Sequence, residues 1–192
     1  MIQAIFFDYH GVLDRRSYAG LVEVLIKAIP HPPADIRNRL EPQVYAYATG
    51  VTAPNVFWNA MTEAYGPSVV QTAKKYHLHV EPIREMWEAV NHLHEKYAIG
   101  LLTDCSADKR DVIIRSYNLP EFFDQLIFSC ETRETKMDPN FYRRMLQAGR
   151  WQPEEVLLID DSHQAIGQAK SLGFQTHEFT SPKECLTFFH RL

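Results

Sequence analysis

The stretch Ile5-Phe6-Phe7-Asp8-Tyr9-His10-Gly11-Val12-Leu13-Asp14 decides the fold of this chain. Its short apolar beginning predicts a buried strand, and the change to Asp8 and Gly11 predicts a loop directly after it. In open α/β sheets, ligands bind just outside the carboxyl ends of the strands. An isolated carboxylate is costly to bury, so Asp8 at such an end suits chemistry better than packing. Taken alone, Asp8 is equally well explained as a turn residue, and the rest of the chain must decide.

The composition indicates an ordinary globular protein. The chain has 192 residues, of which 45% are apolar and 23% charged, and its formal net charge is -4. The absence of a basic stripe argues against nucleic acid as a partner. No apolar run approaches the roughly 20 residues that span a bilayer, and no secretory signal is evident. The three widely spaced cysteines (Cys105, Cys130 and Cys185) resemble free thiols, so we expect a cytoplasmic protein.

The segment between residues 15 and 80 has a helical pattern throughout. Apolar residues recur at helical spacing in four pieces, and Pro30, Gly50 and Gly66 end three of them. The segment lacks the alternation or the short apolar runs that indicate strands. It therefore predicts an all-helical insertion directly after the first strand.

Strands and helices alternate in residues 81–192. Short apolar runs at 98–103, 126–128, 156–159 and 174–179 predict strands, and segments with helical spacing lie between them. Such alternation implies a parallel sheet with right-handed crossovers. We therefore expect an α/β fold with a doubly wound, Rossmann-like parallel sheet of about five strands. Residues 1–14 and 81–192 form this core domain, and residues 15–80 form a small helical domain.

Polar side chains follow four of the predicted strands. They are Asp8, Thr103, Lys136 beyond the third run, and the pair Asp160-Asp161. Because parallel strands end at the same edge of a sheet, these groups can converge. Two carboxylates suit Mg²⁺, and a hydroxyl with an ammonium group suits phosphate. Each residue alone is more often structural, so the prediction depends on the ordered set.

This ordered set resembles the haloacid dehalogenase superfamily of hydrolases along essentially the whole chain. The first motif of that family, Asp-x-Asp-Gly-Val/Thr-Leu, is similar to the run from Asp8 to Leu13. The second, a strand ending in Ser or Thr and then usually Asn, corresponds to Thr103-Asp104. The third, a Lys commonly in Lys-Pro-Asp-Pro, corresponds to the run from Lys136 to Pro139, and the fourth, two acids, to Asp160-Asp161. Residues 15–80 resemble a cap, and the branch looks like the small phosphatases related to the N-terminal domain of epoxide hydrolases.

The resemblance implies a Mg²⁺-dependent phosphatase that acts on a small phosphorylated metabolite. Asp8 would be the nucleophile and would form an aspartyl-phosphate that water hydrolyses. The Asp8 carboxylate, the backbone carbonyl of His10 and Asp161 would hold Mg²⁺, with Asp160 as a further or outer ligand. The cap would close over the site and select the substrate.

The phosphoryl group has its own expected partners. Thr103 and the neighbouring backbone at Asp104 would fix the phosphoryl oxygens. Lys136 would offset the crowded negative charge and position the nucleophile, which makes it both a catalytic and a phosphate-binding residue. The sequence leaves the oligomeric state and the identity of the substrate open.

Four positions depart from the family pattern. In the family's phosphatases, the residue aligned with His10 is an Asp that protonates the leaving oxygen and later activates water. An imidazole with an ordinary pKa near 6.5 can replace that acid, or the change can weaken catalysis. Asp104 replaces an Asn and brings negative charge beside the phosphate site, Met137 replaces a Pro, and Ala165 replaces an Asn or Asp.

These departures leave two other functions open. A metal-independent haloacid dehalogenase does not need the missing acid, but the retained pair Asp160-Asp161 argues against it. A catalytically weakened protein of the same fold, kept for binding, would explain the changes at His10, Asp104 and Ala165.

Overall fold

The protein is built on a central parallel sheet. A computed structural model describes residues 1–192, apart from the side chain of Ala148. The sheet has five strands in the order β3-β2-β1-β4-β5. The strands are β1 (Ala4–Phe7), β2 (Ala98–Thr103), β3 (Gln125–Phe128), β4 (Val156–Asp160) and β5 (Gln175–Glu178). The predicted α/β fold is confirmed, although the last strand is shorter than residues 174–179.

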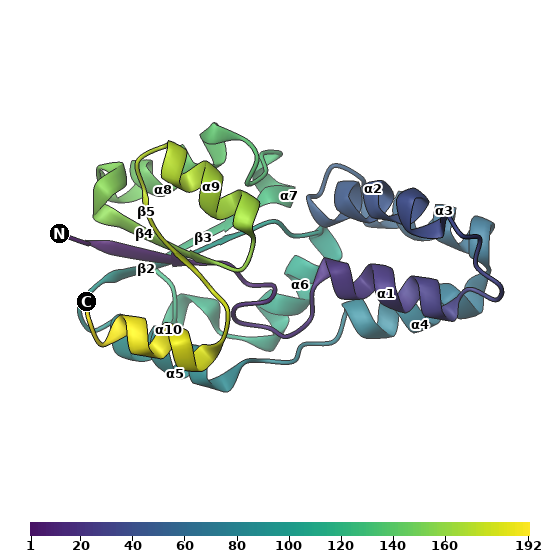
Figure 1. The fold of residues 1–192 in the computed structure, drawn as a ribbon, viewed down its shortest axis with the longest axis horizontal. Helices are drawn as coiled ribbons and strands as arrows, with labels where there is room; N and C mark the ends of the chain where they lie inside the picture. Colours follow the sequence, from purple (N-terminus) through teal and green to yellow (C-terminus); the bar gives the residue numbers. More distant parts are fainter.

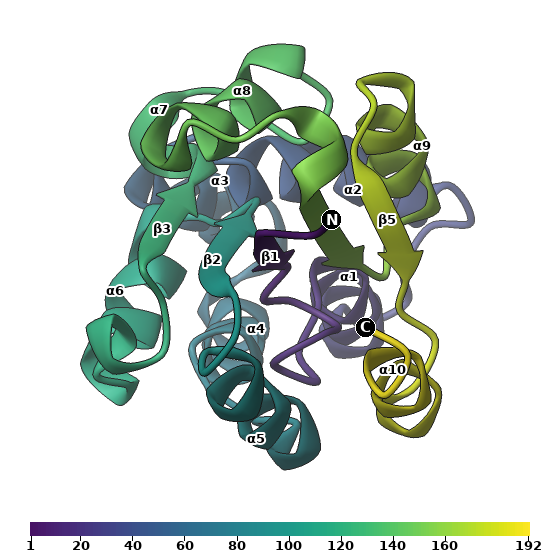
Figure 2. The same cartoon turned by 90° about the vertical axis from the view of Figure 1, so that its left-hand side faces the viewer.

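Helices cover both faces of this sheet (Figure 2). On one side are α5 (Arg84–Leu93), α6 (Ala107–Ser116) and α10 (Pro182–Phe189), and on the other are α7 (Ser129–Thr132), α8 (Pro139–Gly149) and α9 (His163–Ser171). Strand β1 lies in the centre, where Ile5 packs toward one layer and Phe6 toward the other. A strand that is buried on both faces must be apolar at every position, which explains its uninterrupted apolar run.

Four helices form a separate body beside the sheet (Figure 1). They are α1 (Tyr18–Ala28), α2 (Ile36–Ala48), α3 (Pro54–Tyr65) and α4 (Pro67–His77). Buried residues from all four make a second hydrophobic cluster, which includes Leu21, Leu40, Trp58 and Val70. We call this four-helix body the cap. Its status as an independent domain stays a prediction.

Two linkers join the cap to the sheet, and the buried Asp14 ties them together. Its carboxylate accepts hydrogen bonds from the Tyr9 hydroxyl (3.0 Å) and from the backbone N–H groups of Arg16 (2.7 Å) and Glu81 (2.9 Å). The backbone N–H of Arg15 also donates to the carbonyl of Glu81 (2.8 Å). This pairing fixes the loop that follows β1.

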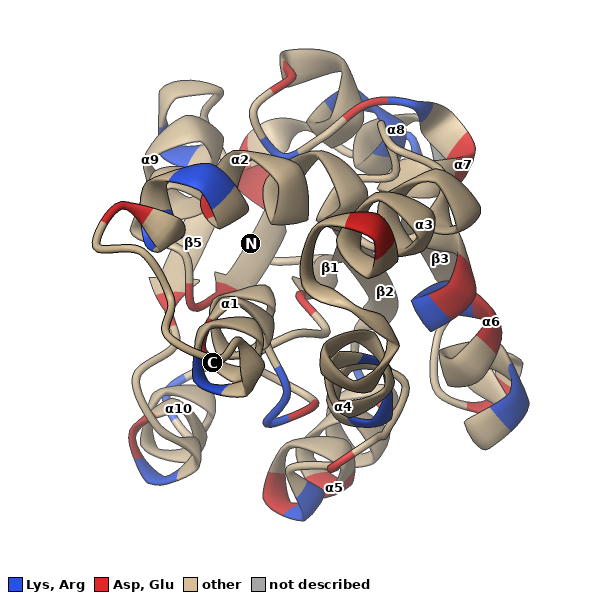
Figure 3. Ribbon diagram, turned by 90° about the vertical axis from the view of Figure 1, so that its right-hand side faces the viewer, with Lys and Arg blue, Asp and Glu red and all other residues tan. Residues whose placement is uncertain are grey.

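Charges are distributed without a dominant sign over the cap side of the molecule. Figure 3 shows Lys and Arg interspersed with Asp and Glu along the helices on that side. In the described part of the chain, the helices lack the length and apolar character that crossing a membrane requires.

Candidate active site

The register of the sheet brings the predicted strand-end residues to one edge. Phe7, the last residue of β1, pairs with Leu101 of β2 and Ile159 of β4. Asp8 follows at once, and its backbone N–H donates to the carbonyl of Ile159 (2.9 Å). Thr103 ends β2 and Asp160 ends β4 at this same edge.

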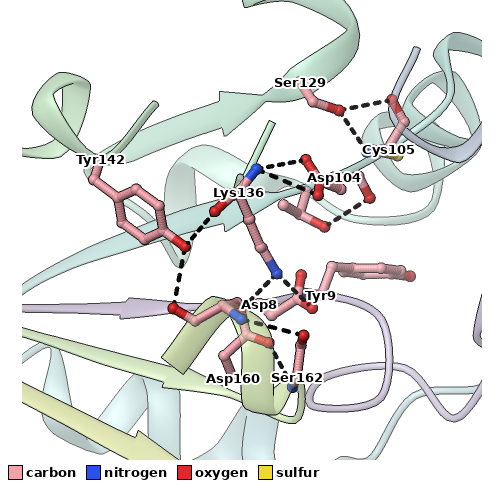
Figure 4. Close-up of polar contacts among 11 residues, drawn as sticks. Asp8, Tyr9, Asp104, Cys105, Ser129, Lys136, Tyr142, Asp160 and Ser162 are labelled. Carbon is pink, nitrogen blue, oxygen red and sulfur yellow. Dashed lines mark hydrogen bonds and ion pairs between the residues drawn. The ribbon is translucent and has the colours of Figure 1, made fainter. Parts of the chain in front are cut away.

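Lys136 reaches this edge from the loop between α7 and α8 (Figure 4). Its Nζ lies 2.7 Å from Asp8 Oδ2 and 2.6 Å from Asp160 Oδ2, and all three side chains are buried. The Tyr142 hydroxyl donates to the Lys136 carbonyl (2.8 Å). The lysine is therefore held at its backbone as well as at its ammonium group. Sequence reasoning missed Tyr142, whose only signal is its position six residues later in a predicted helix.

A third carboxylate lies beside the two that contact this single ammonium group. Asp8, Asp160 and Asp161 present carboxylate oxygens that lie within 4.8 Å of one another. Burial, together with the neighbouring acids, raises the pKa of Asp8, although Lys136 opposes the change. Burial and then Asp160 also raise the pKa of Asp161. We call Asp8, Lys136, Asp160 and Asp161 the acid cluster; its negative charge exceeds its positive charge.

The donor set of the acid cluster fits Mg²⁺, which prefers carboxylate oxygens. The Asp161 carboxylate of this set packs against the backbone of Gly11, which has a positive φ of 83°. A Cβ added there would lie 2.0 Å from Asp161 Oδ2, so a larger residue would displace that carboxylate. Glycine is therefore required at this position for both conformation and space.

His10 lies between the acid cluster and the cap. Its side chain is buried, and its ring centroid is 4.6 Å from that of Tyr18. Among the described residues, neither ring nitrogen has a hydrogen-bond partner. Burial and then the charge of Lys109 hold the pKa of His10 well below its usual value. The imidazole is therefore neutral at neutral pH and is a poor proton donor in this state.

The two other predicted phosphate-site residues are engaged within the protein. The Asp104 carboxylate accepts from the backbone N–H of Lys136 at 3.2 and 3.4 Å, and burial raises its pKa to about 6. Thr103 is fully buried, and its hydroxyl donates to the Asp104 carbonyl (3.3 Å). Asp104 therefore shapes the loop that carries the lysine, which sequence reasoning did not anticipate.

A cavity of about 480 Å³ separates the edge of the sheet from helices α1 and α2 of the cap. This volume is within the roughly 300–1,000 Å³ of small-molecule sites. The core contributes Asp8, His10, Lys136 and Asp161 to its lining, and the cap contributes Tyr18, Val22, Val44 and Ala48, among others. The acid cluster is thus open to a ligand of metabolite size.

A second polar cluster lies beside the cavity, at the beginning of α6. Asp108 accepts hydrogen bonds from the Tyr47 hydroxyl (2.8 Å), the Trp58 indole N–H (3.0 Å) and the Ser106 hydroxyl (2.8 Å). The Ser106 backbone N–H donates to the Tyr18 hydroxyl (2.9 Å). Despite burial, hydrogen bonds from Trp58, Tyr47 and Ser106 lower the pKa of Asp108.

His77 completes this second cluster, because its Nε2 lies 3.1 Å from the Ser106 hydroxyl. We call the six residues the α6 anchor: Tyr18, Tyr47, Trp58, His77, Ser106 and Asp108. One comes from each of the four cap helices, and the other two come from the start of α6. The anchor holds the cap against the core.

Comparisons with known proteins agree with this fold. A family model described as haloacid dehalogenase-like hydrolase matches residues 32–178. A phosphorylated carbohydrates phosphatase from Thermotoga maritima is 28% identical over 95 residues, which are 48% of this chain and 42% of that protein. The chain spans under half the length of the curated relatives that it matches.

Two solved structures share the fold over most of this chain. One is an enzyme of the same family from Bacteroides thetaiotaomicron in complex with magnesium and inorganic phosphate. It has a TM-score of 0.77 and 19% identity, and the match covers 94% of this chain and 95% of that one. The other is an L-2-haloacid dehalogenase from Xanthobacter autotrophicus with chloropropionic acid covalently bound, with a TM-score of 0.64, 18% identity and coverage of 93% and 77%.

Proposed function

Because the chain belongs to the haloacid dehalogenase-like hydrolase family, we propose that it is a Mg²⁺-dependent phosphatase of a small phosphorylated metabolite. The observation that carries the proposal is the acid cluster itself. Asp8 lies 2.7 Å from the Lys136 ammonium, beside two further carboxylates, at the floor of a cavity. The phosphatase name of the Thermotoga maritima relative and the magnesium and phosphate of the Bacteroides thetaiotaomicron enzyme support it.

The proposed reaction has two displacements at phosphorus. Asp8 attacks the phosphoryl group, a bond to its carboxylate oxygen forms, and the bond to the alcohol oxygen breaks. Water then attacks the phosphorus of the aspartyl-phosphate, which releases inorganic phosphate and restores Asp8. Lys136 orients the nucleophile and offsets the charge on the phosphoryl oxygens in both steps.

The metal and the leaving group complete the proposal. Asp8, Asp161 and the His10 carbonyl would hold Mg²⁺, which neutralises phosphoryl oxygens and lowers the cost of bringing a carboxylate to a dianion. The neutral, buried imidazole of His10 makes a poor donor to the alcohol oxygen. We therefore expect His10 to contribute its backbone carbonyl, and the turnover of unactivated esters to be slow.

The experiment is a phosphate-release assay over a panel of monoesters, with Mg²⁺ and with EDTA. We expect turnover only with Mg²⁺, and its reduction on the order of 10⁴-fold by Asp8→Asn. Asp35→Asn is the matched control, because Asp35 is an exposed residue of the cap. It should leave the rate unchanged.

The assay also distinguishes the two other functions. If the protein releases halide from a 2-haloacid and EDTA does not change the rate, it is a metal-independent dehalogenase. Such an enzyme does not need an acid at the position of His10. No turnover of any ester, together with a melting temperature that BeF₃⁻ and Mg²⁺ leave unchanged, would identify a fold kept for binding.

A further inference from the structure

The wall that the cap contributes to the cavity has an apolar part beside its polar side chains. Helix α1 contributes Ala19 and Val22 to it, and α2 contributes Val44 and Ala48. Any part of a ligand that extends from the acid cluster toward the cap must contact these side chains. Apolar surface of this kind favours an apolar ligand because contact removes both from water.

The polar side chains on this wall are already engaged within the protein. The Ser17 hydroxyl accepts from the backbone N–H of Gly20 (3.1 Å), and the Thr49 hydroxyl donates to the Tyr45 carbonyl (2.9 Å). The Tyr18 hydroxyl belongs to the α6 anchor. Each of these three hydroxyls therefore already has a hydrogen-bond partner within the protein.

The charged end of the wall is also compensated. The Arg37 guanidinium contacts Glu23 (2.5 Å) and Glu41 (3.3 Å), so two carboxylates surround one positive charge. Tyr45 is the other polar side chain of α2 on this wall, and it is 52% accessible. A ligand hydroxyl placed against Val22, Val44 or Ala48 would lose its water without gaining a partner from these side chains.

We propose that the alcohol part of the substrate is an apolar chain or ring and not a sugar. This inference rests on the proposed phosphatase function and concerns the same cavity. The acid cluster receives the phosphoryl group, and the apolar wall receives the carbon skeleton. Each sugar hydroxyl buried there without a partner lowers kcat/KM by about tenfold.

The test compares cyclohexylmethyl phosphate with glucose 6-phosphate in the presence of Mg²⁺. Both esters carry a six-membered ring on a primary alcohol, so the bond that breaks is closely matched. We expect kcat/KM to be at least about tenfold higher for cyclohexylmethyl phosphate. Equal or better turnover of glucose 6-phosphate would overturn the inference and leave the phosphatase function standing.

Two other outcomes separate the inference from the function on which it rests. If the protein cleaves other monoesters but neither cyclohexylmethyl phosphate nor glucose 6-phosphate, the result counts against an apolar wall that receives a ring. Turnover of no ester overturns the phosphatase function and the inference with it.

A pair of variants tests the wall directly. Ala19→Asn adds an amide at an exposed, cavity-lining position of α1, and Ala64→Asn makes the same change at an exposed position of α3 outside the cavity. We expect Ala19→Asn to lower the preference for cyclohexylmethyl phosphate at least threefold and Ala64→Asn to leave it unchanged. Circular dichroism confirms that both variants fold, and an unchanged preference in Ala19→Asn would contradict contact between α1 and the substrate.

Discussion

The acid cluster and the α6 anchor are two neighbouring groups of largely buried polar side chains that differ in their balance of charge. In the acid cluster, two carboxylates contact one ammonium group, and the carboxylate of the exposed Asp161 lies beside them. In the anchor, one carboxylate accepts hydrogen bonds from three different side chains. The first arrangement carries excess charge and faces a cavity, whereas the second is satisfied within the protein. The comparison teaches that burial of a carboxylate does not indicate chemistry, but incomplete compensation beside a cavity does.

The two clusters also differ in what they connect. The acid cluster joins the ends of β1 and β4 to the loop that precedes α8. The anchor joins α6 to every helix of the cap, so it determines where the cap wall of the cavity lies relative to Asp8. The proposed catalysis and the placement of the cap therefore depend on different carboxylates, the buried Asp8 and the half-buried Asp108.

The largest effect on stability is expected from Asp108→Ala. The substitution leaves the Tyr47 hydroxyl and the Trp58 indole N–H without their acceptor, which should cost about 2 to 3 kcal/mol in the free energy of unfolding. Urea unfolding monitored by circular dichroism measures it. Asp8→Asn is the matched comparison and should not destabilise the metal-free protein, because burial and the neighbouring acids already disfavour the ionised carboxylate there. A loss below about 0.5 kcal/mol for Asp108→Ala would show that the anchor contributes no more than a surface group.

The two clusters also differ in how well the sequence predicts them. Each residue of the acid cluster follows an apolar strand or lies in a family motif, and parallel strands must end at one edge. The anchor has no such pattern, because its residues come from five helices or their ends and meet only when the cap packs on the core. Ser106 illustrates the limit: it occupies the N-cap position of α6, but its hydroxyl donates to Asp108.

The sequence shows which residues depart from the family pattern, but it does not show what each change does in the structure. The sequence indicates that Asp104 adds negative charge beside the phosphate site. The structure shows its carboxylate on the backbone N–H of Lys136, a contact between loops 32 residues apart. Such a contact depends on the path of the loop before α8, which local sequence patterns do not specify.

His10 connects the two clusters, since it lies in the cavity lining and its ring contacts Tyr18 of the anchor. We expect His10→Asp to raise the kcat for alkyl phosphates by about 10- to 100-fold, because a carboxylic acid at this position can protonate the leaving oxygen. Steady-state kinetics with Mg²⁺ measures it, and the double variant with Asp8→Asn should be inactive. A fall in kcat together with the loss of a titrating group from the pH profile would show that the imidazole itself transfers the proton.

The smallest effect is the pH dependence of stability in the metal-free protein. Burial and neighbouring acids raise the pKa of Asp8 from its ordinary 3.8 to about 8 in the folded state. Between these values Asp8 binds more protons in the folded protein than in the unfolded chain, so its contribution to the free energy of unfolding falls as the pH rises. Below about pH 6.5 the lowered pKa values of His10 and His77 oppose this change. Between about pH 6.5 and 8 we therefore expect a slope of roughly 1 kcal/mol per pH unit in urea unfolding with EDTA.

The same titration tests whether the excess charge of the acid cluster is the cause. Asp8→Asn should flatten the slope, because the amide does not ionise, whereas Asp108→Ala should leave it unchanged. Mg²⁺ should restore stability most strongly at the upper end of the pH range, where the carboxylates are ionised and bind a cation best. If the free energy of unfolding of Asp8→Asn has the same pH slope, the titrating group lies elsewhere. Asp8 and Asp108 would then not differ in the way that we infer.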